Sequence, residues 1–201
     1  MRASVVLPVK NGAPYLRELL PALSAQVLDG GLDVLAVDSG SSDESLAVLS
    51  AHGVRTLQIP PEPGLTDVLA GKLGLSDVLV QTDLENLVVL PPGAPGPHVP
   101  ELLTSAAPAH LISTITERYP NHVIVMDTPP CLASTDPTAL AVIARQVVFV
   151  VEATHTQQPE IESALNMISG CSNISLLLNL VPDSASEHFG SYSYYYQGPE
   201  K

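Results

Sequence analysis

Short apolar runs alternate along the chain with segments in which apolar residues recur every three or four positions. The runs predict strands at 3–9, 33–38, 54–59, 86–91, 122–127, 146–153 and 173–181. The helical spacing predicts helices at 13–26, 101–118, 137–145 and 158–170, and one from Ser41 or Ser42 to about His52. Strands and helices therefore follow one another along most of the sequence.

Strands that are apolar throughout and separated by helices predict a parallel sheet covered on both faces. We expect a three-layer α/β sandwich with a mostly parallel sheet of Rossmann-like or P-loop-like type. A ligand would bind at the carboxyl ends of the strands. A chain of 201 residues suits one such domain. We place the domain at 1–182, followed by a flexible Tyr-rich tail at 183–201.

Charge narrows the classes of partner. The formal net charge is −13, with only eight Lys and Arg residues. Nucleic acids and anionic membranes are disfavoured, because both are bound through clustered cations. No apolar run is long enough to span a bilayer, so direct membrane insertion is not expected, and the predicted location is the cytoplasm. Cys131 and Cys171 are expected to be free thiols.

Several ordered motifs in the second part of the chain point to one family. They are GLTDVLAG, ENLVVLPPG, VIVMDTPP, QVVFVVEATHTQ, ISLLLN and a terminal SYSYYYQ. Together they resemble the tyrosine autokinases (BY-kinases) of bacterial exopolysaccharide and capsule biosynthesis, over residues 64–200. The resemblance implies use of ATP and Mg²⁺. It also implies a homo-oligomer, or a partnership with an intact tyrosine autokinase and its membrane activator.

The autokinase resemblance assigns roles to particular residues. Asp127 ends the Walker B-like strand and would contact Mg²⁺ through water, and Asn179 would lie near the adenine base. The tail would carry the phosphoacceptors Tyr192, Tyr194, Tyr195 and Tyr196. Three alternatives need no ligand: Asp127 as a strand-end carboxylate, Asn179 as a hydrogen-bonded strand-end amide, and the tail as a low-complexity segment.

Residues 3–61 resemble something else, the start of a family 2 glycosyltransferase of the A-type fold. The resemblance is carried by VVLPVKNGAPYL and DVLAVDSGSSDES. It implies that Lys10, Asn11 and Asp38, with Pro8 and Val9, border the base and ribose of a UDP-sugar bound with Mn²⁺. Asp43 would cap the next helix or lie nearby. The alternative for VDSGSSD is a strand, a turn and a helix cap without a ligand.

Both resemblances are incomplete. An autokinase needs a phosphate-binding loop, but GxxxxGK[ST] occurs nowhere in the chain, and the first strand–helix turn reads PVKNGAPYL. A glycosyltransferase needs a metal-binding Asp-x-Asp, which is absent after residue 61. We therefore predict one domain of hybrid ancestry, with a glycosyltransferase-like segment at 1–61 and an autokinase-like segment at 64–182.

Three functions remain open at this point. The first is an autokinase-like protein with ATP binding weakened or lost, whose tyrosine cluster is phosphorylated. The second is a glycosyltransferase-like binder of sugar nucleotides. The third is a regulatory or interaction protein without enzymatic activity. Binding of ATP with Mg²⁺ would favour the first function, and binding of a UDP-sugar with Mn²⁺ would favour the second. Absence of binding to either ligand would favour the third.

Overall fold

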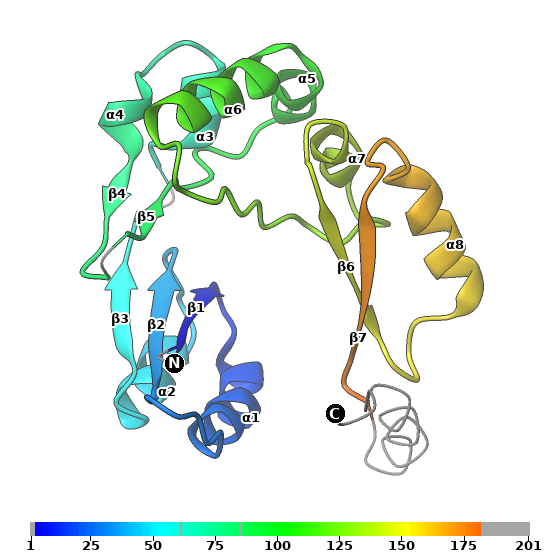
Figure 1. The fold of residues 1–201 in the computed structure, drawn as a ribbon. Coiled ribbons are helices and arrows are strands. Elements are labelled where there is room, and N and C mark those ends of the chain that lie inside the picture. Colours follow the sequence, from blue (N-terminus) through cyan, green and yellow to red (C-terminus); the bar gives the residue numbers. More distant parts are fainter. Residues whose placement is uncertain (1–2, 61, 85, 182–201) are drawn as a thin grey trace, which may run out of the picture. The chain divides into compact units, whose positions relative to one another are not determined.

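The structure is a computed structural model that describes residues 3–60, 62–84 and 86–181 (Figure 1). The chain divides into two compact units, Met1–Leu102 and Leu103–Lys201, and each is described by itself. The tyrosine cluster at 192–196 lies outside the described residues. Within the described residues, no helix combines the length and apolar character needed to cross a membrane.

The first unit opens with a parallel three-stranded sheet in the order β1-β2-β3. Its elements follow one another as β1 (Ala3–Val9), α1 (Ala13–Ser24), β2 (Leu32–Asp38), α2 (Ser45–Ala51) and β3 (Arg55–Gln58). Each connection between strands is a helix, as parallel pairing requires. The register sets Val9 beside Asp38, and Asp38 beside Gln58. The carboxyl ends of these strands therefore meet at one edge of the sheet.

The amphipathic helix α1 packs on one face of this sheet. Its buried residues are Ala13, Leu16 and Leu20, at the predicted helical spacing. They pack with buried residues of β1, β2 and α2 in one cluster: Val9, Ala36, Val48 and Leu49. The expected helix and its apolar stripe are thus confirmed, although α1 ends at Ser24 rather than at residue 26.

The rest of the first unit comes from the autokinase-like part of the sequence. It contains α3 (Leu65–Leu69), α4 (Leu75–Val78), β4 (Val80–Gln81) and β5 (Val88–Val89). Strands β4 and β5 pair antiparallel. Their residues Val80 and Val89 pack, together with Leu84 and Leu87, against Leu35, Val37 and Ile59. The segments predicted to be glycosyltransferase-like and autokinase-like therefore share one hydrophobic core within this unit.

Helix α5 (Val99–Thr104) runs across the boundary between the units. The second unit then contains α6 (Ala107–Arg118), α7 (Asp136–Ala141), β6 (Val147–Glu152), α8 (Gln158–Met167) and β7 (Ile174–Asn179). Strands β6 and β7 are parallel and form a two-stranded sheet (Figure 1). Ala141, Ile168 and Cys171 form the buried cluster beside it.

The fold class is confirmed as α/β with mostly parallel strands. Within the described residues, however, the strands are divided among three sheets rather than joined in one. The domain organisation, one domain at 1–182 with a tail, stays a prediction.

The strand expected at 122–127 is wrong for this structure. Residues 122–130 have no regular secondary structure, and the side chains of Val123 and Val125 are each 86% exposed. An apolar β-branched run satisfies its backbone in a sheet only where a neighbouring strand offers a partner, and β6 pairs with β7 in a two-stranded sheet. The pattern predicted strand propensity correctly but could not supply the partner strand.

Candidate functional site

The loops that follow β1 and β2 form the best-defined polar arrangement at the carboxyl edge of the three-stranded sheet. They span residues 9–13 and 38–45, and they come together because Val9 and Asp38 are partners in the register. The backbone N–H of Ser39 donates to the carbonyl oxygen of Val9 at 3.0 Å, which ties the two loops at their base. Ligands of open parallel sheets bind at this edge.

Side chains of the second loop accept hydrogen bonds from the amino end of α1. The N–H of Asn11 donates to Ser41 Oγ at 2.9 Å, and the N–H of Gly12 donates to Ser45 Oγ at 2.9 Å. The N–H of Ala13 donates to Asp43 Oδ2 at 3.1 Å. Unpaired N–H groups at a helix start are the usual anion-binding groups. Here three successive donors are used within the protein.

Asn11 makes the reciprocal contact from the first loop. Its Oδ1 accepts from the N–H of Ser42 at 2.9 Å and from the hydroxyl of Ser42 at 3.3 Å. The residue adopts φ 52°, a left-handed conformation that Asn tolerates better than most residues. Asn11 therefore locks the two loops together.

Asp43 is the charged member of this arrangement. Its Oδ1 accepts from the N–H of Ser45 at 2.9 Å, while its Oδ2 takes the Ala13 donor. The Ser45 hydroxyl has the largest effect and lowers the pKa of Asp43. Desolvation opposes it, and the N–H groups of Ser45 and Ala13 lower the pKa further. The carboxylate form is thus favoured at the amino end of α1.

Asp38 is the buried member. It is 2% exposed, and its Oδ2 accepts from the N–H groups of Gly40 and Ser41, both at 3.1 Å. Its Oδ1 is buried without a hydrogen-bond partner in the described part of the chain. An unsatisfied buried acceptor costs about 1–3 kcal/mol, so this atom calls for a functional explanation.

The structure brings three of the predicted nucleotide-binding residues together. Lys10, Asn11 and Asp38 all lie on these two loops, and Lys10 is exposed beside the interlocked turn. The roles assigned to them by resemblance stay predictions. The contacts of Ser41, Ser45 and Asp43 to α1 were not anticipated, because Ser and Asp after a strand predict a cap on the following helix rather than on the preceding one.

The other predicted site residues lie in the second unit. Asn179 ends β7 opposite Glu152 of β6, and both side chains are exposed. Asp127 is exposed in the irregular segment 122–130. Among the described residues, no group of three or more His, Cys, Asp and Glu side chains is arranged to hold a metal ion. The roles of Asp127 in Mg²⁺ binding and of Asn179 near adenine therefore stay predictions.

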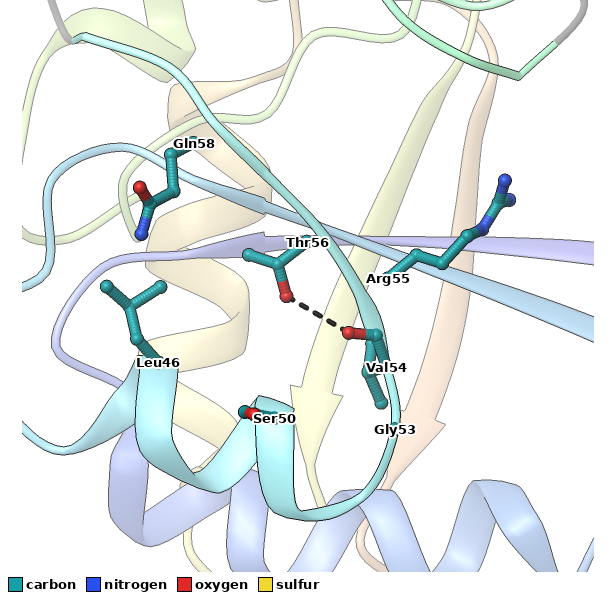
Figure 2. A pocket seen from close by; sticks show the side chains of 7 residues that line it. All are labelled: Leu46, Ser50, Gly53, Val54, Arg55, Thr56 and Gln58. Carbon is teal, nitrogen blue, oxygen red and sulfur yellow. Dashed lines mark hydrogen bonds between the residues drawn. The ribbon is translucent and has the colours of Figure 1, made fainter.

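An open pocket of about 570 Å³ lies elsewhere on the first unit, between α2 and β3 (Figure 2). Figure 2 shows Leu46 and Ser50 from α2 facing Thr56 and Gln58 from β3. The Thr56 hydroxyl is turned toward the chain and donates to the carbonyl oxygen of Val54 at 3.2 Å. No predicted site residue lines this pocket.

Known proteins resemble the two parts of the chain differently. The model of the family Glycosyl transferase family 2 matches residues 4–62. The chain is 31% identical over 140 residues to CapB of Staphylococcus aureus, which its name places among the tyrosine-protein kinases; the match covers 69% of this chain and 59% of CapB. It is 27% identical over 176 residues to the tyrosine-protein kinase CpsD of Streptococcus agalactiae, covering 87% of this chain and 73% of CpsD.

A solved structure agrees at the level of fold. The VpsO kinase domain matches with a TM-score of 0.55 and 24% identity, over 90% of this chain and 85% of that domain. This match shows a shared α/β fold. The homologues of this chain are the bacterial tyrosine-protein kinases, and its first 60 or so residues carry the glycosyltransferase match in addition. The chain spans 59% of the length of CapB.

Proposed function

We propose that the chain is a tyrosine-autokinase-like protein of bacterial capsule or exopolysaccharide biosynthesis that has lost or weakened its own ATP binding. Similarity to the tyrosine-protein kinases CapB and CpsD supports the family assignment. The sequence lacks GxxxxGK[ST], and the first strand–helix turn uses its N–H donors internally. Phosphoryl transfer depends on positioning and charge neutralisation by a phosphate loop and Mg²⁺, so an ATPase-type site is incomplete here.

In this proposal the chain acts as a substrate. Tyr192, Tyr194, Tyr195 and Tyr196 are the phosphoacceptors, modified by an intact tyrosine autokinase that works with its membrane activator, or within a shared oligomer. Each phosphate adds about −1.5 to −2 charges, so a modified tail would be repelled by an acidic neighbour. The proposed location is the cytoplasm.

The deciding experiment incubates the full chain with an intact capsular tyrosine kinase and ATP·Mg²⁺, and maps phosphate by mass spectrometry. We expect phosphate on the tail tyrosines and none when the kinase is omitted. A variant with these four tyrosines changed to Phe should take up no phosphate. This variant still carries Tyr15, which is 77% exposed, so the result would show that phosphorylation is specific to the tail. An unmodified tail would reject the substrate role, and phosphate without added kinase would reject the loss of activity.

Mg²⁺ and ATP belong to the proposal as weak or lost ligands. If the chain does bind ATP·Mg²⁺, Asp127 is the proposed metal contact, and Asp127→Asn should abolish the Mg²⁺ dependence of binding. Calorimetric titration with and without Mg²⁺ measures this. Binding that persists unchanged in Asp127→Asn would remove the Walker B-like role from this residue.

A second candidate function is favoured by the bare Asp38 Oδ1 together with the glycosyltransferase match at 4–62. In it, residues 8–11 and Asp38 border the base and ribose of a UDP-sugar, with Mn²⁺ as the metal. Asp38 would accept a hydrogen bond from the ligand through Oδ1. Titration with UDP and Mn²⁺ should release heat that Asp38→Asn removes. If the cooperatively folded chain releases no heat with UDP and Mn²⁺, this second candidate function is rejected, and a regulatory protein without enzymatic activity is the remaining alternative.

A further inference from the structure

The position that a P-loop would give to phosphate is the amino end of the helix after the first strand. In this chain that position is α1, a helix of 12 residues whose first donors point into the β2–α2 loop. The N–H groups of Asn11 and Gly12, which precede α1, and of Ala13, its first residue, donate to Ser41, Ser45 and Asp43, respectively. The last of these partners is a carboxylate, which carries the same sign of charge as a phosphate.

The partners of α1 form a connected set. The buried Ser45 hydroxyl accepts from Gly12 and also hydrogen-bonds to Asp43, so the charge of Asp43 is coupled to two donors of the turn. Asp43 itself is exposed at the mouth of the turn. A phosphate approaching these N–H groups would meet the carboxylate first and would have to displace it.

We propose that Asp43 is a built-in occupant of the phosphate position, and that it excludes phosphate groups from the amino end of α1. This inference rests on the proposed loss of ATP binding and names the residue responsible. The missing Gly-rich motif deprives the turn of a cradle, and the Asp43 carboxylate takes the Ala13 N–H, while the Asn11 and Gly12 N–H groups donate to Ser41 and Ser45. Restoring a lysine alone would not restore phosphate binding while the carboxylate stays in place.

A neighbouring acid supplies a matched control. Glu44 is adjacent to Asp43 and carries the same charge, but it pairs with Arg17. Asp43→Ala and Glu44→Ala therefore change the net charge of the chain equally. Only Asp43→Ala frees the Ala13 N–H and removes a carboxylate from the turn. A difference between the two variants would report the specific contact rather than general charge.

The test is an NMR titration of the full chain with inorganic phosphate, and separately with ATP·Mg²⁺, following the backbone amides of Asn11, Gly12 and Ala13. In the wild type and in Glu44→Ala these amides should not respond. In Asp43→Ala the Ala13 amide, and with it its neighbours in the turn, should shift with saturation as phosphate is added. The dispersion of the remaining amides checks that each variant is folded.

Two results would overturn the inference. One is a saturating shift of these amides in the wild type, which would mean that phosphate displaces Asp43. The other is a folded Asp43→Ala variant whose amides stay silent, which would mean that something else excludes phosphate. Neither result depends on phosphorylation of the tyrosine tail, so a failure here and a failure of the proposed substrate role are distinguishable.

Discussion

Residues 3–102 and residues 103–181 use the same kinds of strand, but they bury them to different extents. In β2, Leu35, Ala36 and Val37 are successive buried residues. In β7, Leu176, Leu177 and Leu178 are successive leucines with 62%, 46% and 46% exposure. The strand β2 lies between β1 and β3 with a packed layer on each face, whereas β7 pairs with β6 in a two-stranded sheet. An apolar run becomes core only when neighbours cover both of its faces.

The glycosyltransferase match and the compact units divide the chain at different places. The match ends at residue 62, whereas the boundary between the compact units falls at Leu102. Residues 80–89 of the autokinase-like part pack on Leu35, Val37 and Ile59 of the glycosyltransferase-like part. The end of a family match along a sequence therefore need not be a boundary between compact units, because shared burial decides which segments belong together.

The largest expected effect contrasts two leucines. Leu35→Ala, at 1% exposure in the shared core, should lower the free energy of unfolding by about 2–5 kcal/mol, because it leaves a cavity. Leu177→Ala on β7 should cost less than about 1 kcal/mol. Urea unfolding measures both changes in the free energy of unfolding, and hydrogen exchange checks each one locally. Equal losses would mean that the outer face of β7 is covered in solution.

The second test targets the junction between the two segments, which lies at residues 62–64. A Cβ at Gly64 would collide with the carbonyl oxygen of Pro91 and the N–H of Gly93, so Gly64→Ala should cost roughly 1–3 kcal/mol. Gly96→Ala is the control, since a Cβ there meets no atom within 4 Å. Thermal unfolding compares them. If both variants melt alike, the close approach of residues 64 and 91–93 does not hold the junction together.

The third test probes the two ion pairs of Arg55, of which the pair with Asp83 joins the segments before and after residue 62. Arg55 contacts Asp33 at 2.8 Å and Asp83 at 2.9 Å, and its side chain is 42% exposed. Arg55→Ala should lower the free energy of unfolding by about 0.5–1 kcal/mol at low salt, and by less at high salt, because the pairs are partly solvated. Chemical denaturation at two ionic strengths is the measurement. A loss that is insensitive to salt would point to packing of the Arg55 stem instead.

The smallest expected effect is a pH dependence at Asp43, in the loops that follow β1 and β2. The folded-state pKa of Asp43 is lowered, so its contribution to stability is present above the ordinary carboxyl pKa of about 3.9 and is lost as pH falls through the folded-state value. We expect the Ala13 amide resonance to move in that acidic range and to stay constant above it. NMR titration measures this, with Asp43→Asn as the control. Movement near neutral pH would contradict the lowered pKa.

Much of the first unit could be predicted from the sequence, because its signals are local. The period of Leu16 and Leu20 predicts α1, and the apolar run ending at Asp38 predicts β2. The gathering of Lys10, Asn11 and Asp38 followed from parallel pairing of two strands. The contact of Asp43 with Ala13 could not be predicted, since it joins residues 30 positions apart through the packing of two loops.

The sequence by itself determined the alternation of elements, the acidic charge, the absence of a P-loop motif and the two family resemblances, since each is a property of residue order. Only the tertiary structure decided which segments share a core, that residues 122–127 lack a strand partner, and that Asp43 accepts from the Ala13 N–H at the amino end of α1. Those outcomes depend on which surfaces meet, and local propensity carries no information about the distant partner.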